Sequence, residues 1–381
     1  MNNSPLYIRI CKELEERKKN NLFREIPEFN QDIKINLSTN SYLSLETNSE
    51  VIYWANKFSQ GILHGNLASR LIETKFSLFE TLEKEIADWK NSPSALLFNS
   101  GYAANVGVIE ALCTKDTHVF CDRLNHASII DGIRLSSAIL TRYKHCDIDD
   151  LNAKLKASEK KEKLIITDTV FSMDGDFAPL DKICELKRKY NCMLMVDEAH
   201  ATGIFGKKLS GCVEKFGLEN EVDIVIGTLS KAVAGLGGFF CGNKTLKEYF
   251  VNKARSLIYS TALPNSVLAW NYAAIKYIRQ HPELGEKLQS KADFLRKEIT
   301  AIGFNTLNSQ THIIPCIVES EEKSLSLSRF LFEQKIKVPC IRPPTVPKGT
   351  SRIRISVNLG ITDEDIKYLL NCLYRWKKKN A

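Results

Sequence analysis

The sequence has no long apolar run, no paired-cysteine motif and no concentrated basic patch. A membrane-spanning helix needs about 18–20 consecutive apolar residues, and no segment approaches that length, so we expect no membrane partner. The 53 basic residues exceed the 45 acidic residues, but they are scattered apart from short runs at 17–19 and 377–379. A nucleic-acid-binding face requires a clustered basic surface with a recognisable reading motif. We therefore predict no nucleic-acid partner, whereas the net charge of +8 leaves an acidic partner such as an acyl carrier protein open.

The eleven cysteines form no CxxC pair, and their number is odd. Several of them, including Cys192 and Cys241, lie beside apolar segments, where a free cysteine behaves as a small hydrophobic side chain. This usage predicts neither a zinc site nor a disulfide framework and favours a reducing compartment. Charged residues such as Arg9, Lys12 and Glu13 interrupt the N-terminal segment, which argues against a signal peptide. We therefore expect a cytoplasmic protein.

The length of 381 residues, with 44% hydrophobic and 26% charged residues, is typical of a globular protein of two or three domains. From about residue 95 to residue 240, short apolar strands alternate with helical segments. This alternation predicts an α/β fold with a mostly parallel sheet that helices cover on both faces. Beyond about residue 277, strands and helices are mixed, which indicates a smaller α+β domain. We predict an N-terminal arm, a large domain and a small C-terminal domain at 1–42, 43–276 and 277–381.

Lys231 follows a short apolar segment, Asp223–Leu229, that has the composition of a buried strand. A lysine at the edge of a buried sheet is costly to bury as an ammonium ion, unless its amine reacts with a group such as an aldehyde. The neighbouring Thr228 and Ser230 add hydroxyls that could hold a phosphate beside that aldehyde. Most lysines of a basic chain are solvated surface groups, but the strand-end position of Lys231 favours a chemical role.

Asp197 and His200 follow a second apolar strand, at 193–196. An aspartate at the carboxyl end of a parallel strand lies where open α/β sheets bind their ligands. Pyridoxal 5'-phosphate (PLP) needs a carboxylate there, because the carboxylate keeps the ring nitrogen protonated and makes the ring an electron sink. His200 would then bond the phenolic oxygen of the ring. Taken alone, the pair is better explained as a helix-capping aspartate and a structural histidine, but together with Lys231 it indicates a PLP site.

The segments Val196–Gly203 and Gly227–Ala232 resemble the signature segments of the α-oxoamine synthases. These fold-type I PLP enzymes join an amino acid to an acyl thioester with loss of carbon dioxide. The resemblance extends from Asn36 to near the C-terminus and implies a PLP-dependent transferase. Within the family, the segments 170–176 and 341–347 are similar to the branch that joins L-alanine to a pimeloyl thioester in biotin biosynthesis, although the first segment is shared more widely. The thiol of the donor, coenzyme A or a carrier protein, stays open.

The resemblance assigns the PLP-binding residues to strand ends and helix starts: Gly101, Tyr102, His126, Ser172, Asp197, His200, Thr228, Lys231 and Thr261. Of these, His126, Asp197, His200 and Lys231 are the predicted catalytic residues, with His126 stacked on the pyridine ring. Backbone N–H groups at the helix start of Gly101 and Tyr102 would bind the phosphate, although capping by Ser100 explains that motif equally well. Thr261 is expected to approach the phosphate of a neighbouring subunit, which implies a homodimer with shared active sites.

The predicted substrate-binding residues are Asn40, Arg342 and Arg354. By resemblance, Asn40 and Arg354 hold the amino-acid carboxylate, a natural partner for a guanidinium group. Arg342 is expected to meet the substrate acid or the pimeloyl end. The sequence departs from the family pattern at Ser41, Thr74, Asp168 and Ile361. These departures leave a non-catalytic paralogue open as an alternative. A second alternative is a sister enzyme such as a glycine C-acetyltransferase, which joins another amino acid to a different acyl group.

Overall fold

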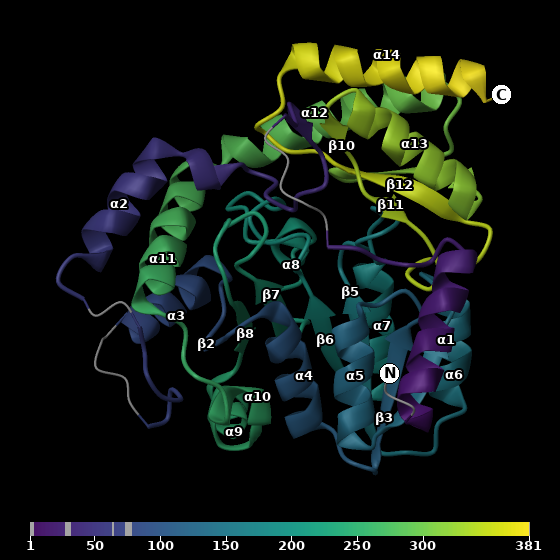
Figure 1. Cartoon of the computed structure of the whole chain (residues 1–381). Coiled ribbons are helices and arrows are strands. Elements are labelled where there is room, and N and C mark those ends of the chain that lie inside the picture. Colours follow the sequence, from purple (N-terminus) through teal and green to yellow (C-terminus); the bar gives the residue numbers. More distant parts are fainter. Residues whose placement is uncertain (1–3, 27–31, 63–64, 73–77, 381) are drawn as a thin grey trace. The chain divides into compact units, whose positions relative to one another are not determined.

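The computed structural model describes residues 4–26, 32–62, 65–72 and 78–380 (Figure 1). The chain forms two compact units. The first, here called the sheet unit, consists of Asn40–Ser172 and Asp176–Gln289. The second, here called the terminal unit, consists of the described residues within 1–39, 173–175 and 290–381. The predicted division into three parts at residues 42 and 276 stays a prediction.

The sheet unit is built on a seven-stranded sheet with the order β2-β8-β7-β6-β5-β3-β4. Neighbouring strands from β7 to β4 pair in parallel, whereas β8 pairs antiparallel with both β2 and β7. This confirms the predicted mostly parallel sheet. The strands are β2 (Ser94–Phe98), β3 (Thr117–Asp122), β4 (Ile139–Tyr143), β5 (Glu162–Asp168), β6 (Met193–Asp197), β7 (Ile224–Thr228) and β8 (Gly238–Gly242).

The central strands of this sheet are largely apolar and buried, as expected for strands that helices cover. Leu96, Ile166 and Ile226 are among the side chains buried in its core. The helix α4 (Gly101–Leu112) packs against β2, β7 and β8, and α5 (Ala127–Ser136) lies beside it (Figure 1). The other helices that begin in this unit are η1 (Leu45–Thr47), α2 (Ser49–Ser59), α3 (Leu78–Trp89), α6 (Ile148–Lys156), α7 (Leu180–Tyr190), α8 (Cys212–Lys215), α9 (Lys244–Lys253), α10 (Arg255–Ile258), α11 (Asn265–Gln280) and α12 (Glu283–Ala301).

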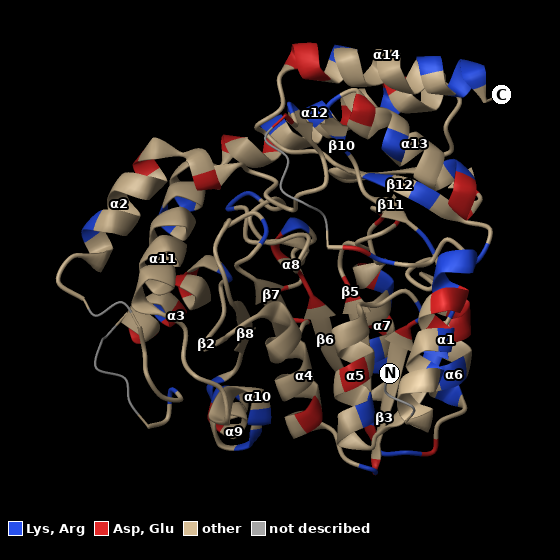
Figure 2. Ribbon diagram, viewed as in Figure 1, with Lys and Arg blue, Asp and Glu red and all other residues tan. Residues whose placement is uncertain are grey.

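The terminal unit contains helices and two small sheets. One is antiparallel, with the order β11-β12-β9, and the other pairs β1 with β10 in parallel. Its last helix, α14, begins with a capping box between Thr362 and Asp365. Acidic residues occupy the first turn of α14 and basic residues its last turn, which complements the helix dipole (Figure 2). The elements are α1 (Pro5–Lys19), β1 (Ile35–Asn36), β9 (Ile313–Glu319), α13 (Glu321–Glu333), β10 (Ile336–Lys337), β11 (Cys340–Ile341), β12 (Ser351–Ser356) and α14 (Asp363–Lys379).

Two features predicted from composition can be compared with the structure. All eleven cysteines lie among the described residues, and each is a free thiol. Among the same residues, every helix is too short or too polar to cross a bilayer.

Candidate active site

A cavity of about 250 Å³ lies at the carboxyl ends of the parallel strands of the sheet unit. Open α/β sheets bind their ligands at this edge, because the loops that follow the strands converge there. Eight of the nine predicted PLP-binding residues line the cavity: Gly101, Tyr102, His126, Ser172, Asp197, His200, Thr228 and Lys231. Asp168, one of the departures from the family pattern, lines it as well.

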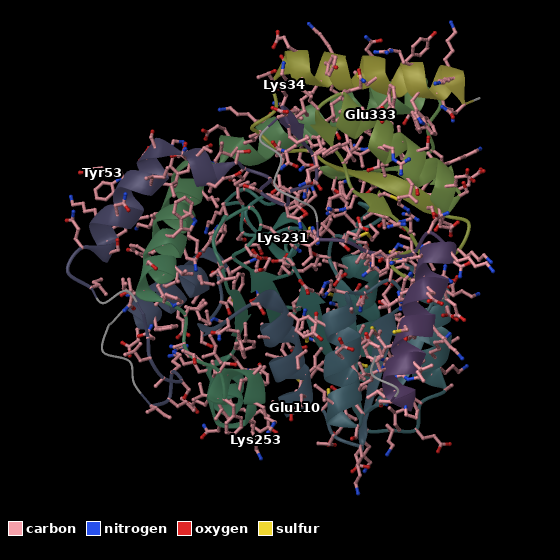
Figure 3. The ribbon with its side chains drawn as sticks, in the orientation of Figure 1. Lys34, Tyr53, Glu110, Lys231, Lys253 and Glu333 are labelled. Carbon is pink, nitrogen blue, oxygen red and sulfur yellow. The ribbon has the colours of Figure 1, made fainter. Side chains whose placement is uncertain are left out.

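The amine of Lys231, a side chain labelled in Figure 3, belongs to a hydrogen-bonded chain of side chains. Lys231 Nζ lies 2.7 Å from His200 Nε2, and His200 Nδ1 lies 2.7 Å from the hydroxyl of Tyr42. The Tyr42 hydroxyl in turn donates to Asn40 Oδ1 at 3.0 Å. One consistent assignment has Tyr42 accept from His200 Nδ1–H, so that His200 Nε2 accepts from the ammonium group of Lys231. Asn40, predicted to bind substrate, is therefore connected to the candidate catalytic lysine.

Asp197 is the last residue of β6, and two N–H groups hold its carboxylate. The backbone N–H of Ala199 donates to Oδ1 at 2.8 Å, and Asn105 Nδ2 donates to Oδ2 at 2.7 Å. Asn105 Nδ2 also donates to Ser128 Oγ at 3.0 Å. Asn105 Oδ1 is buried without a hydrogen-bond partner among the described residues. These two bonds leave the Asp197 carboxylate with a defined orientation at the cavity.

Two functional candidates, Asn105 and Tyr42, were missed by the sequence prediction. Asn105 is 1% exposed on a mostly apolar stretch of α4, and Tyr42 is fully buried. A buried amide in an apolar helix needs a polar partner, and this signal in the sequence could have drawn attention to Asn105.

His126 and Asp168 are joined at one wall of the cavity. The backbone N–H of His126 donates to Asp168 Oδ2 at 3.2 Å, while Asp168 Oδ1 is buried with no partner among the residues described. Burial raises the pKa of Asp168 well above its usual value, and the charge of Asp197 raises it further. His126 lines the cavity, and the loss of surrounding water on burial lowers its pKa; Asp197 opposes this effect and Lys231 adds to it. Burial and the charge of Asp197 therefore both favour the protonated form of Asp168 over the ionised form.

The start of α4 and the end of β7 form a corner suited to an anion. Gly101 and Tyr102 begin α4, and the first turn of a helix presents N–H groups that lack a partner within the helix. A side chain at Gly101 would come within 3.2 Å of Thr228 Cβ, so the backbone there lies directly against Thr228. Thr228 Oγ1 lies 2.8 Å from Ser230 Oγ. Ser100 also caps the helix by accepting from the backbone of Ala103, so capping and anion binding are compatible.

Three other predicted residues are not among those that line this cavity. Thr261 is exposed in the sheet unit, where its carbonyl accepts from Asn99 Nδ2 at 2.6 Å. Arg354 lies in β12 of the terminal unit, is 4% exposed and donates to Ser356 Oγ at 2.9 Å. Arg342 follows β11 and donates to the backbone oxygen of Asn21. Their predicted roles stay predictions.

Two of the remaining departures from the family pattern, Ser41 and Ile361, make hydrogen bonds to nearby side chains. Ser41 donates to the carboxylate of Glu46, and Ile361 is buried with its carbonyl bound to Lys291 Nζ. Thr74 lies outside the described residues.

Sequence comparison with known proteins gives one family model and relatives that share one enzyme name. Residues 32–373 match the family model described as aminotransferase class I and II. A relative from Lysinibacillus sphaericus named 8-amino-7-oxononanoate synthase is 42% identical over 338 residues, which are 88% of this chain and 86% of the relative. A relative from Geobacillus kaustophilus, provisionally given the same name, is 46% identical over 341 residues, or 89% of this chain and 87% of its own.

Solved structures agree with these sequence matches. A serine palmitoyltransferase from S. paucimobilis with bound PLP has a TM-score of 0.91 and 27% identity, covering 100% of this chain and 99% of its own. The 8-amino-7-oxononanoate synthase from Francisella tularensis has a TM-score of 0.78 and 28% identity, covering 92% of this chain and 99% of its own.

Proposed function

Because the chain belongs to the class I and II aminotransferase family and to its α-oxoamine synthases, we propose that it condenses L-alanine with a pimeloyl thioester. The products are 8-amino-7-oxononanoate, carbon dioxide and the free thiol. The observation that carries the proposal is the cavity that brings the Lys231 amine, the Asp197 carboxylate and the His126 ring together in one fold-type I enzyme. The chain is a PLP-dependent transferase of this kind.

PLP fits the residues that line this cavity. Lys231 would hold its aldehyde, Asp197 its ring nitrogen and His126 its ring face. The backbone of Gly101 and Tyr102, with Thr228, would hold its phosphate, and Ser172 with His200 its phenolic side. The buried oxygens of Asn105 and Asp168, which lack partners among the described residues, show that the cavity has further hydrogen-bonding capacity. When bound, PLP supplies an electron sink for the electron pair that remains when a proton leaves the α-carbon of alanine.

The side chains of this protein supply the proton transfers and the orientation. We assign Lys231 Nζ as the base that removes the α-proton and later returns a proton to the product. His200 Nε2, 2.7 Å from that amine, orients it, and the hydrogen bond to Tyr42 fixes the histidine ring. Asn105 and the N–H of Ala199 keep the Asp197 carboxylate in one orientation. Each group therefore meets the reacting atoms from a fixed position.

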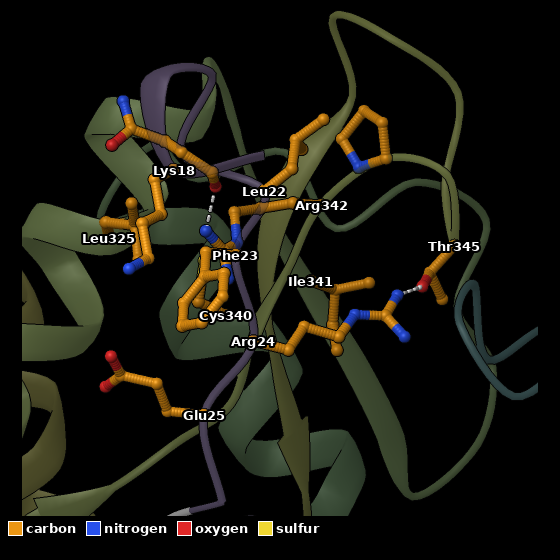
Figure 4. Close-up of a pocket in the computed structure, with 12 residues that line it drawn as sticks. Lys18, Leu22, Phe23, Arg24, Glu25, Leu325, Cys340, Ile341, Arg342 and Thr345 are labelled. Carbon is orange, nitrogen blue, oxygen red and sulfur yellow. Dashed lines mark hydrogen bonds between the residues drawn. The ribbon is translucent and has the colours of Figure 1, made fainter. Parts of the chain in front are cut away.

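The pimeloyl part of the proposal is supported by a second cavity, of about 590 Å³, within the terminal unit (Figure 4). Apolar side chains such as Phe23, Leu325 and Ile341 line it together with the cations Arg24 and Arg342. Its hydrogen bonds include one from Arg24 Nη2 to Thr345 Oγ1 at 3.0 Å and one from Arg342 to the backbone oxygen of Asn21. A cavity that combines apolar side chains with guanidinium groups suits an aliphatic chain that ends in a carboxylate. We assign Arg342 to the free carboxylate of the pimeloyl group and Arg354, with Asn40, to that of alanine.

A substrate panel tests the proposal. The purified enzyme with PLP is incubated with L-alanine, glycine or L-serine and with pimeloyl, acetyl or palmitoyl thioesters of coenzyme A, and with pimeloyl carrier protein. Products are identified by mass. We expect 8-amino-7-oxononanoate as the main product, and none from the Lys231→Ala variant. Preferred use of glycine and acetyl-coenzyme A would establish the sister activity instead, and no product from any pair would refute an active enzyme.

The proposal extends to assembly and location. We propose a cytoplasmic homodimer in which Thr261 of each subunit completes the phosphate site of its partner. Sedimentation of the holoenzyme at the mass of one chain would contradict this arrangement.

A further inference from the structure

His145 lies outside the PLP cavity, in the connection between β4 and α6, and both nitrogens of its ring face carboxylates. Nδ1 lies 3.1 Å from Asp122 Oδ1 and 3.2 Å from Asp122 Oδ2, and Nε2 lies 2.9 Å from Asp176 Oδ2. The ring also makes an edge contact with Phe171, with centroids 4.3 Å apart. A histidine that meets acceptors on both sides must be a donor on both sides, which requires the imidazolium form.

The first carboxylate, Asp122, shapes the turn that leads to His126. It ends β3 and is 1% exposed. Its Oδ1 accepts from the backbone N–H of Leu124 at 2.8 Å, and its Oδ2 accepts from the backbone N–H of Cys146 at 2.9 Å. The turn continues through Asn125, which donates to the Ile166 carbonyl at 2.8 Å. His126, at the end of this turn, lines the PLP cavity.

The second carboxylate, Asp176, closes the segment that carries Ser172. The backbone N–H of Phe171 donates to the Asp176 carbonyl at 3.1 Å, and Val170 pairs with Phe177 across the same segment. Val170 and Ser172 both line the PLP cavity. His145 thus connects two cavity segments that lie far apart in the sequence.

We propose that His145 is a positioning residue for the cofactor: as a cation between Asp122 and Asp176, it fastens the segments that present His126 and Ser172 to PLP. The inference rests on the PLP-binding part of the proposed function and not on the identity of the acyl donor. Neither His145 nor its two carboxylates line the cavity, so the effect passes through the backbone.

His145 keeps its positive charge over the pH range of ordinary assays. Burial lowers the pKa of His145, but the hydrogen bonds to Asp122 and Asp176 outweigh burial and raise it to about 12. The titratable groups that face the ring are Asp122 from β3, Asp176 and the adjacent Cys146, whose sulfur lies 3.7 Å from both ring nitrogens. Burial raises the pKa of the Cys146 thiol, so the thiol stays neutral. Because the folded pKa of His145 is raised, its contribution to stability is complete below about pH 6.5 and declines between there and about pH 12.

The test compares PLP binding by full-length H145Q and H118Q variants. Gln retains a polar side chain of similar reach but carries no charge. His118 is a matched control in β3, because its ring nitrogens meet the neutral hydroxyls of Ser158 and Thr141. PLP affinity is measured by titration of the apoprotein, the visible circular dichroism band of bound PLP reports the cofactor's surroundings, and no acyl thioester is present.

We expect H145Q to bind PLP about tenfold or more weakly and to show a smaller visible band, since in metal sites the loss of a group that orients the direct ligands costs about 10- to 100-fold. H118Q should match the original protein. D176N, which keeps His145 paired with Asp122, should give a smaller effect and serves as the test if H145Q does not fold. Original PLP affinity and band shape in a folded H145Q, even with a lowered melting temperature, would reduce His145 to a structural role and overturn the proposal.

One further measurement addresses a competing occupant. The side chains of Asp122, His145 and Cys146 are close enough to hold a metal ion. If the purified protein contains stoichiometric zinc and H145Q does not, the segments are held by a metal ion and not by protonated His145, and the proposal is wrong. Absence of zinc, together with the expected loss of PLP affinity in H145Q, supports the proposed role of protonated His145. Neither result depends on which substrates are condensed, so failure here leaves the proposed reaction standing.

Discussion

Replacing Asn105 with alanine should slow removal of the α-proton of alanine without unfolding the protein. Asn105 Nδ2 donates to Asp197 Oδ2 at 2.7 Å, and the side chain is 1% exposed, so water cannot easily replace the lost donor. A hydrogen bond to a charged group contributes about 1.5–3 kcal/mol. Each factor of ten in rate corresponds to about 1.4 kcal/mol. If the whole energy of the bond stabilises the transition state, its loss lowers the rate of α-proton removal by about 10- to 100-fold.

The assay is exchange of the α-proton of L-alanine for deuterium, followed by NMR at saturating PLP without a thioester. Asn271→Ala is the matched control, because Asn271 is also a buried asparagine but donates to the Leu236 carbonyl at 2.9 Å instead of to Asp197. Both variants are expected to lose some thermal stability, since each loses a buried hydrogen bond. Only Asn105→Ala should lose exchange rate. An unchanged exchange rate in folded Asn105→Ala would refute the reasoning that Asn105 supports Asp197.

Three other substitutions give distinct outcomes. Lys231→Ala should lower turnover by at least about 10²-fold, because a positioned base contributes about 10²–10⁴-fold; normal turnover at saturating PLP, measured as product formation, would remove Lys231 from the mechanism. Asp168→Asn should raise the melting temperature more at pH 8 than at pH 5, because burial raises the pKa of Asp168 and makes the folded protein hold a proton that the unfolded chain releases. Equal shifts at both pH values in thermal denaturation would show that Asp168 is ionised in the fold. Arg342→Ala should raise KM for the pimeloyl thioester about tenfold or more with little change in kcat. The control Arg329→Ala, at an exposed position of α13, should change neither constant. Equal kinetics in the two variants would show that Arg342 does not bind the acyl group.

The sequence predicted those site residues that follow strands. Lys231, Asp197 and His126 each come after an apolar strand of one parallel sheet, and the carboxyl ends of such strands meet at one edge. A local pattern together with one topological rule therefore brings them to one cavity. Gly101 and Tyr102 were predictable for a similar reason, because a helix start after a strand points to the same edge.

Asn105 and Tyr42 could not be found in this way. Asn105 meets a residue 92 positions away in the sequence, and Tyr42 meets one 158 positions away. Neither follows a strand, and the hydrogen bond that gives each its use exists only after the sheet unit has packed. His145 is similar, since its role depends on two carboxylates that separate segments deliver.

The buried groups around the cavity divide into two sets by charge, and this division explains why the site suits a charged planar cofactor. Burial raises the pKa of Asp168 and lowers that of His126, so it favours the neutral form of both groups. His145 carries a charge, but Asp122 and Asp176 surround it behind the cavity wall. The groups left to meet a ligand by charge are the Lys231 amine and the Asp197 carboxylate, each held by hydrogen bonds to neighbouring groups. A ligand with an aldehyde, a basic ring nitrogen and a phosphate uses both of these groups and the helix start at Gly101, whereas a neutral apolar ligand would desolvate Lys231 and Asp197 without supplying an opposite charge to either.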